Sequence, residues 1–203
     1  MAFDPFKCPT TESLPTLTGI DSCQTSIDQV QKIAFQKTGG ASFTSTSILT
    51  SAAWTTALAA TEPDKIIVSP YLQKVVITPG EVIETGDANN LNGMPQHEGF
   101  GFTVVTAEIH NAPHTVITAL KTLTELSSRQ AGVTGIKGYF FGENSRITAT
   151  AGADGIYLYN FTISDVMTEG KRKANVHKVR FLLADGWSED LQTFNASFDP
   201  NTL

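Results

Sequence analysis

Two histidines have the spacing of metal ligands on a helix. His110 and His114 lie four residues apart, which would put both side chains on one helical face. Pro113 stands between them, where a strand-like run gives way to a helix-like run, and this change breaks the required geometry. We therefore interpret the pair as a cap histidine and a surface histidine, and predict no metal site.

Two further motifs lie between Asp87 and Phe102. The run from Asp87 to Gly93 resembles part of a calcium-binding loop, but Leu91 fills its fifth position and the glutamate expected as bidentate ligand is missing. His97-Glu98 could act as an acid and a base, but adjacent residues of an extended chain point to opposite faces. Both motifs are typical of turns, so we predict no cofactor.

Three scattered carboxylates, those of Asp154, Asp165 and Glu169, could serve a hydrolase, but nothing in the sequence links them in space. The chain has no G-x-S-x-G elbow, no P-loop lysine followed by serine or threonine, and no paired C-x-x-C motifs. We predict that the protein is not an enzyme.

The charge balance argues against nucleic-acid binding. The chain carries 20 acidic residues against 14 Lys and Arg, and its net charge of −6 would repel phosphates. Hydrophobic residues make up 40% of the chain, enough for a folded core, while charged residues make up only 17%. Much of the surface is then neutral, which suits contact with other protein subunits.

Two charged segments could meet across such a contact. A basic cluster surrounds a predicted turn, and the segment from Glu84 to Glu98 is acidic, so one could dock on the other in a neighbouring subunit; a solvated turn is the alternative. The candidate interface residues are Glu84, Asp87, Asn92, His97, Lys171, Arg172 and Lys173. A separate hypothesis is a carbohydrate- or receptor-binding module that stacks ligands on aromatic side chains. Its candidate residues are Tyr139, Tyr157, Tyr159 and Trp187.

The N-terminal residues 1–19 are predicted to form an extended arm, with a disordered segment as the alternative, because three prolines stand among threonines and serines. Cys8 and Cys23 could form a disulfide or remain thiols. The sequence shows no secretory signal and no apolar run of ~20 residues, so we expect no membrane contact and synthesis in the cytoplasm.

The remaining residues, 20–203, are predicted to form one β-rich domain with a long exposed loop at about 84–99. Apolar stripes predict a short helix over about 51–60 and a main helix over about 113–128. Alternating or β-branched runs predict strands over 29–37, 66–68, 72–78, 100–110, 135–141, 146–149, 156–167 and 175–183. The predicted fold class is a β-dominated α+β fold, a β-sandwich or small barrel flanked by the two helices.

From Phe100 onward, the strand FTVVTAEIHN, the helix APHTVITALKTLTEL and the closing run KVRFLLADGWSEDL resemble, in their order, tail tube proteins of tailed bacteriophages and related virion subunits. The resemblance covers about residues 100–191 and is one of pattern. It implies a virion protein that forms stacked, hexameric rings with copies of itself and contacts other virion proteins, with the 84–99 segment as a hairpin reaching the next ring. The N-terminal arm and the helix around Trp54 depart from a minimal tube subunit, which leaves a head decoration or connector protein as alternatives.

Overall fold

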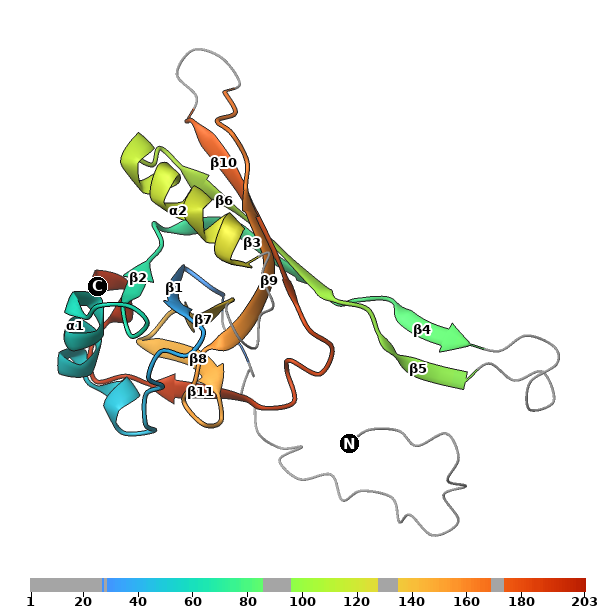
Figure 1. Cartoon of the computed structure of the whole chain (residues 1–203), viewed down its shortest axis with the longest axis horizontal. Coiled ribbons are helices and arrows are strands. Elements are labelled where there is room, and N and C mark those ends of the chain that lie inside the picture. Colours follow the sequence, from blue (N-terminus) through green and yellow to red (C-terminus); the bar gives the residue numbers. More distant parts are fainter. Residues whose placement is uncertain (1–26, 28, 86–95, 128–134, 169–173) are drawn as a thin grey trace, which may run out of the picture.

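The computed structural model describes residue 27 and residues 29–85, 96–127, 135–168 and 174–203. It confirms a β-dominated α+β fold, and Figure 1 shows how its elements are arranged. The helices are α1 (Ser51–Ala59) and α2 (His114–Ser127), and short 3-10 helices span Ser47–Leu49 and Pro200–Thr202. The strands are β1 (Lys32–Lys37), β2 (Ile66–Val68), β3 (Leu72–Thr78), β4 (Val82–Thr85), β5 (Gln96–Phe100), β6 (Thr103–His110), β7 (Ile136–Phe141), β8 (Arg146–Thr150), β9 (Ile156–Ile163), β10 (Val176–Leu183) and β11 (Leu191–Asn195).

Nine of these strands form one antiparallel sheet. Its main path runs β11-β8-β7-β9-β10-β6-β3, and β1 joins β7 and carries β2. Strand β9 belongs to both halves, because its first residues pair with β7 and its later residues pair with β10. Asn160, at the change of partner, has a left-handed backbone with φ of 48°. Where the sequence predicted a β-sandwich or small barrel, the structure has a nine-stranded sheet whose two halves share β9.

The main core lies between the two halves of the sheet and is covered by α2. Strand β6 buries Thr103, Val105, Ala107 and Ile109, which alternate along the strand with less buried residues. Helix α2 adds Ile117, Leu120 and Leu123, which recur with helical spacing and are buried against the same cluster. The burial of these two stripes determines which face of β6 and which face of α2 is turned toward the main core.

A second core lies on the opposite side of β1 and β7. Trp54 of α1 is fully buried there, and its indole Nε1 donates to the Ile48 carbonyl at 2.9 Å. Its ring meets Tyr139 and Phe141 edge-on, with centroids 5.4 and 5.1 Å apart. Both faces of β1 and β7 are therefore buried, so the sequence of these strands shows little alternation between apolar and polar residues.

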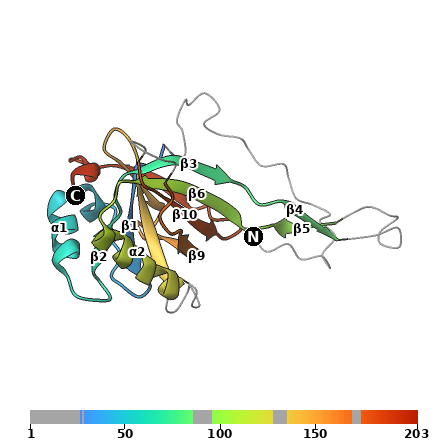
Figure 2. The ribbon, with the colours of Figure 1, turned by 90° about the horizontal axis from the view of Figure 1, so that it is seen from above.

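Strands β4 and β5 form a separate two-stranded ribbon that projects from the body, as Figures 1 and 2 show. The sequence analysis assigned residues 84–99 to a loop, but Glu84 pairs with His97 and Thr85 with Gln96. The loop is therefore shorter than predicted, because ladder hydrogen bonds form even where apolar periodicity is weak. Its tip, residues 86–95, lies outside the described residues.

The sequence analysis missed β4 and all of β5 except Phe100, and it also missed strand β11. It pairs with β8 over Leu191 to Asn195 and buries Phe194 in the second core. Conversely, the predicted strand over 100–110 is divided at Gly101-Phe102, because Phe100 belongs to the ribbon. The predicted arm, residues 1–19, and both cysteines lie outside the described residues.

Candidate assembly interface

The ribbon of β4 and β5 presents apolar side chains that are about half exposed. Val82 and Phe100 are cross-strand partners, and they are 51% and 48% exposed. Ile83 of the same ribbon is 47% exposed. A two-stranded hairpin is at best marginally stable alone in water, because it has no third layer on which to bury such side chains. The ribbon therefore has the character of a surface that another protein covers.

The root of the ribbon is held by close backbone contact. Gly101 N donates to the Glu81 carbonyl at 2.8 Å. A Cβ atom placed on Gly80 would lie 2.0 Å from the Gly101 carbonyl oxygen, so only glycine fits at this crossing. Residues 79–81 and 101 thus form a tight joint between the ribbon and the sheet.

A loop that follows β10 braces the same joint. Asp185 Oδ2 accepts a hydrogen bond from Phe100 N at 3.2 Å, and Trp187 Nε1 donates to Thr103 Oγ1 at 3.1 Å. A groove of about 280 Å³ lies between this loop and the root, with Ile77 and Pro79 on its wall. The direction of the ribbon is therefore set by contacts with the body.

The described part of the ribbon is acidic. Residues 79–85 and 96–102 include Glu81, Glu84 and Glu98 and no lysine or arginine. Thr85 Oγ1 donates to Glu98 Oε1 at 2.6 Å, and the His97 ring stands edge-on to Phe100, with centroids 4.9 Å apart. The ribbon and its root thus combine an exposed apolar pair with three carboxylates.

A second surface, which we call the basic groove, lies at the other end of β3, β6 and β10. It has a volume of about 290 Å³, and its walls include Lys74, Glu108, His110, Met167, Val176 and Lys178. Glu108 Oε2 contacts Lys74 Nζ at 2.9 Å and His110 Nε2 at 3.0 Å. These hydrogen bonds, from His110 first and Lys74 second, hold the pKa of the Glu108 carboxyl below its ordinary value.

The basic groove has unpaired positive charge and exposed apolar surface. Within the described part of the chain, the Lys178 ammonium has no hydrogen bond or ion pair, and neither does the guanidinium of its neighbour on the strand, Arg180. Met167, on the groove wall, is 42% exposed, and Val166 beside it is 55% exposed. The groove therefore offers both charge and apolar contact to a partner.

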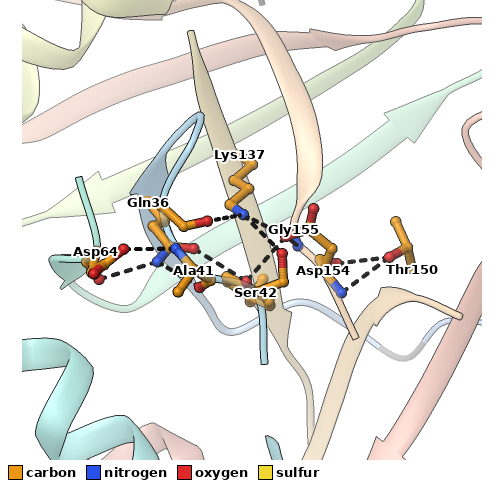
Figure 3. A network of polar contacts seen from close by, with 10 residues as sticks. Gln36, Ala41, Ser42, Asp64, Lys137, Thr150, Asp154 and Gly155 are labelled. Carbon is orange, nitrogen blue, oxygen red and sulfur yellow. Dashed lines mark hydrogen bonds and ion pairs between the residues drawn. The ribbon is translucent and has the colours of Figure 1, made fainter. Parts of the chain in front are cut away.

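Ionisable groups also gather in a buried polar cluster in the body, shown in Figure 3. Lys137 of β7 is 2% exposed. Its Nζ donates to Asp154 Oδ1 at 2.5 Å and to the Gly40 carbonyl at 3.0 Å, and lies 3.4 Å from Ser42 Oγ. Tyr139 donates its hydroxyl to Gln36 Oε1 at 3.3 Å. The cluster links β1, β7 and two turns.

The charges of this cluster are fixed by their surroundings. Burial alone would raise the pKa of the Asp154 carboxyl, but hydrogen bonds from Lys137 and Ser42 outweigh burial and hold the pKa below its ordinary value. Burial, together with the Asp154 charge, raises the pKa of the Tyr139 phenol. A charged Lys137–Asp154 pair and a neutral Tyr139 can tie segments together, which is a structural role.

The structure places only two of the seven predicted interface residues. Glu84 and His97 face each other as cross-strand partners in the ribbon. The other five, Asp87, Asn92, Lys171, Arg172 and Lys173, lie outside the described residues. Sequence reasoning missed the apolar ribbon pair and Lys74. A signal was present for Val82, Ile83 and Phe100, since these apolar residues flank a segment rich in turn residues.

The residues proposed for a carbohydrate- or receptor-binding module and for a hydrolase do not gather in one site among the described residues. Tyr139 is fully buried, Trp187 bonds Thr103, and Tyr159 packs on Phe102 with ring centroids 5.8 Å apart, while Tyr157 is 41% exposed. The carboxylates proposed for a hydrolase bind different lysines: Asp154 pairs with Lys137, and Asp165 pairs with Lys121 of α2. Glu169 lies outside the described residues.

The two histidines with metal-ligand spacing lie on different elements. His110 ends β6 and bonds Glu108, whereas His114 begins α2. Among the residues that the structure describes, no three His, Cys, Asp or Glu side chains are grouped as metal ligands. No helix in that part of the chain is both long and apolar enough to span a bilayer.

Comparisons with known proteins identify no family. The sequence matches no protein-family profile and no curated protein. Among solved structures, it is similar to a chain of the cryo-EM structure of the anti-feeding prophage (AFP) baseplate, 6-fold symmetrised, with a TM-score of 0.33 and 10% sequence identity. The alignment covers 86% of this chain and 99% of that chain. A likeness at this TM-score and identity carries no argument about function.

Proposed function

We propose that this protein is a non-enzymatic structural subunit of a tailed-bacteriophage particle, most specifically a tail tube or tube-like subunit. It assembles with copies of itself into a ring, for which we propose hexameric order, and contacts other virion proteins. A head decoration or connector protein is the alternative within the same class. The sequence pattern over residues 100–191, with its strand, helix and closing strands in the order seen in tube proteins, supports the choice of class.

The observation that carries the proposal is the projecting ribbon. A protein that works as a monomer gains nothing from leaving Val82, Ile83 and Phe100 about half exposed on an extension of its sheet. In an assembly, each ribbon can bury these side chains on a neighbour. Among the described residues, no strand pairs with the outer side of β3, and such a sheet edge can likewise pair across subunits.

Assembly of the purified full chain tests this proposal. Light scattering coupled to size-exclusion chromatography, with electron microscopy of the same fractions, should show rings or stacked rings as concentration rises. The double substitution V82S/F100S should raise the concentration needed for assembly, because it removes apolar area that the partner would cover. The matched control is Tyr157→Ser, which changes an exposed aromatic residue of the body. A wild-type chain that stays monomeric at millimolar concentration would refute the proposal.

A further inference from the structure

We propose that the basic groove accepts the acidic ribbon of a second copy of this chain. This inference rests on the proposed function, since it names the surface through which copies associate. The argument uses the position of the two surfaces in the fold, their charges and their apolar side chains.

The two surfaces lie at opposite ends of the same strands. Strand β3 begins beside the groove, at Leu72, and leads into the ribbon after Thr78. Strand β6 returns from the ribbon at Thr103 and ends at His110 on the groove wall. Figures 1 and 2 show the ribbon leaving the body along the direction of β3 and β6. A copy displaced along these strands therefore brings its ribbon toward the groove of the next.

The charges of the two surfaces are complementary. The groove contains two lysines, Lys74 and Lys178, and one carboxylate, that of Glu108. Its net charge is therefore positive even when His110 is counted as neutral. Arg180, two residues from Lys178 on β10, adds a further unpaired cation among the described residues. The ribbon and its root, residues 79–85 and 96–102, carry three carboxylates and no lysine or arginine. Opposite charges at such a contact set register and partner choice.

Apolar contact supplies the remaining attraction. Val82 and Phe100 form an exposed cross-strand pair on the ribbon, and Met167 and Val176 form apolar wall in the groove. The flexible methionine side chain can adapt to an aromatic partner. Because ribbon and groove are different patches of one chain, the contact is head-to-tail. Such contacts form closed rings or open stacks, depending on the rotation between copies.

A charge-swap experiment on the full chain tests this pairing. The groove variant K74E/E108K/K178E inverts the groove charge while keeping opposite charges side by side within it. The ribbon variant E84K/E98K makes the ribbon basic. Each variant alone should need at least about tenfold more protein to assemble, because like charges then meet at the contact. An equimolar mixture should assemble near the wild-type concentration, with the two variants alternating.

Controls separate this outcome from misfolding and from general charge effects. Lys65→Glu, in the α1–β2 loop, and Glu143→Lys, in the β7–β8 turn, reverse exposed charges elsewhere and should leave assembly unchanged. If circular dichroism shows that the triple variant does not fold, Lys178→Gln replaces it. This single substitution should raise the concentration needed for assembly several-fold. Wild-type assembly by the variants, or no rescue in the mixture of folded variants, would overturn the pairing while leaving the proposed function intact. A monomeric wild type would instead remove the proposed function.

Discussion

Replacing Lys137 with methionine isolates the contribution of the buried polar cluster. Methionine keeps an unbranched apolar stem of similar length, so the substitution mainly removes the ammonium group. The change leaves Asp154 without its cation and the Gly40 carbonyl without its donor. The expected result is a folded protein of reduced stability, because both groups were desolvated on folding.

The size of the loss follows from the exposure of the two partners. Removing one member of a buried ion pair costs about 3–5 kcal/mol, since a buried charge is left uncompensated. The Asp154 side chain is 31% exposed and keeps the hydrogen bond from Gly155 N at 2.8 Å, so its share of the cost is smaller. The unsatisfied Gly40 carbonyl adds about 1–3 kcal/mol. We expect a total of about 2–4 kcal/mol, which for a chain of this size lowers Tm by roughly 4–16 °C.

Urea unfolding followed by fluorescence, at concentrations below assembly, measures this loss. Lys121→Met provides a matched control, because Lys121 also pairs with an aspartate, Asp165, but the two side chains are 46% and 90% exposed. This exposed pair should contribute less than about 1 kcal/mol. If Lys137→Met and Lys121→Met destabilise the protein equally, the reasoning from burial is wrong.

Two further predictions concern the ribbon root and acid stability. Gly80→Ala should loosen the ribbon and speed proteolysis within residues 80–102, because the new Cβ would clash with the Gly101 carbonyl. The control is Gly152→Ala, whose Cβ meets nothing closer than 4.0 Å, and this substitution should leave the proteolysis rate unchanged. Stability should fall below about pH 4, since the pKa of the Asp154 carboxyl is lowered on folding. The stabilisation from the Asp154 carboxylate is complete above its pKa in the unfolded chain. It is lost as the pH falls through the lower pKa of the same group in the folded protein. In urea titrations at a series of pH values, Lys137→Met should make the free energy of unfolding depend less steeply on pH. An unchanged pH dependence would contradict its assignment to Asp154.

Local patterns in the sequence were sufficient to predict the elements with one buried face. Strand β6 alternates buried and less buried residues, and α2 carries an apolar stripe at helical spacing. In each case the spacing of the apolar residues predicts both the element and the face that it buries. Strands β1 and β7 are buried on both faces, so their sequence locates a strand but gives no information on what covers the second face. Trp54 and Phe194 supply that cover from distant segments.

The basic groove was harder to predict because its parts become neighbours only through the fold. Lys74 and Lys178 are distant in the chain, and antiparallel pairing of β3 and β10 with β6 brings both to Glu108. Strand β11 was missed because its five residues, LQTFN, show only one buried apolar position. The Lys137 cluster was missed because a lysine within a predicted strand is ordinarily exposed.

The continuity of the ribbon with β3 and β6 determines how a pull on its tip would be resisted. Strand β6 is matched to β10 over eight residue pairs, from Thr103–Leu183 to His110–Val176. Tension along the ribbon would try to slide β6 past β10, which loads all of these ladder bonds at once instead of opening them one after another. A long particle built from such subunits could then bear axial strain while each body keeps its shape.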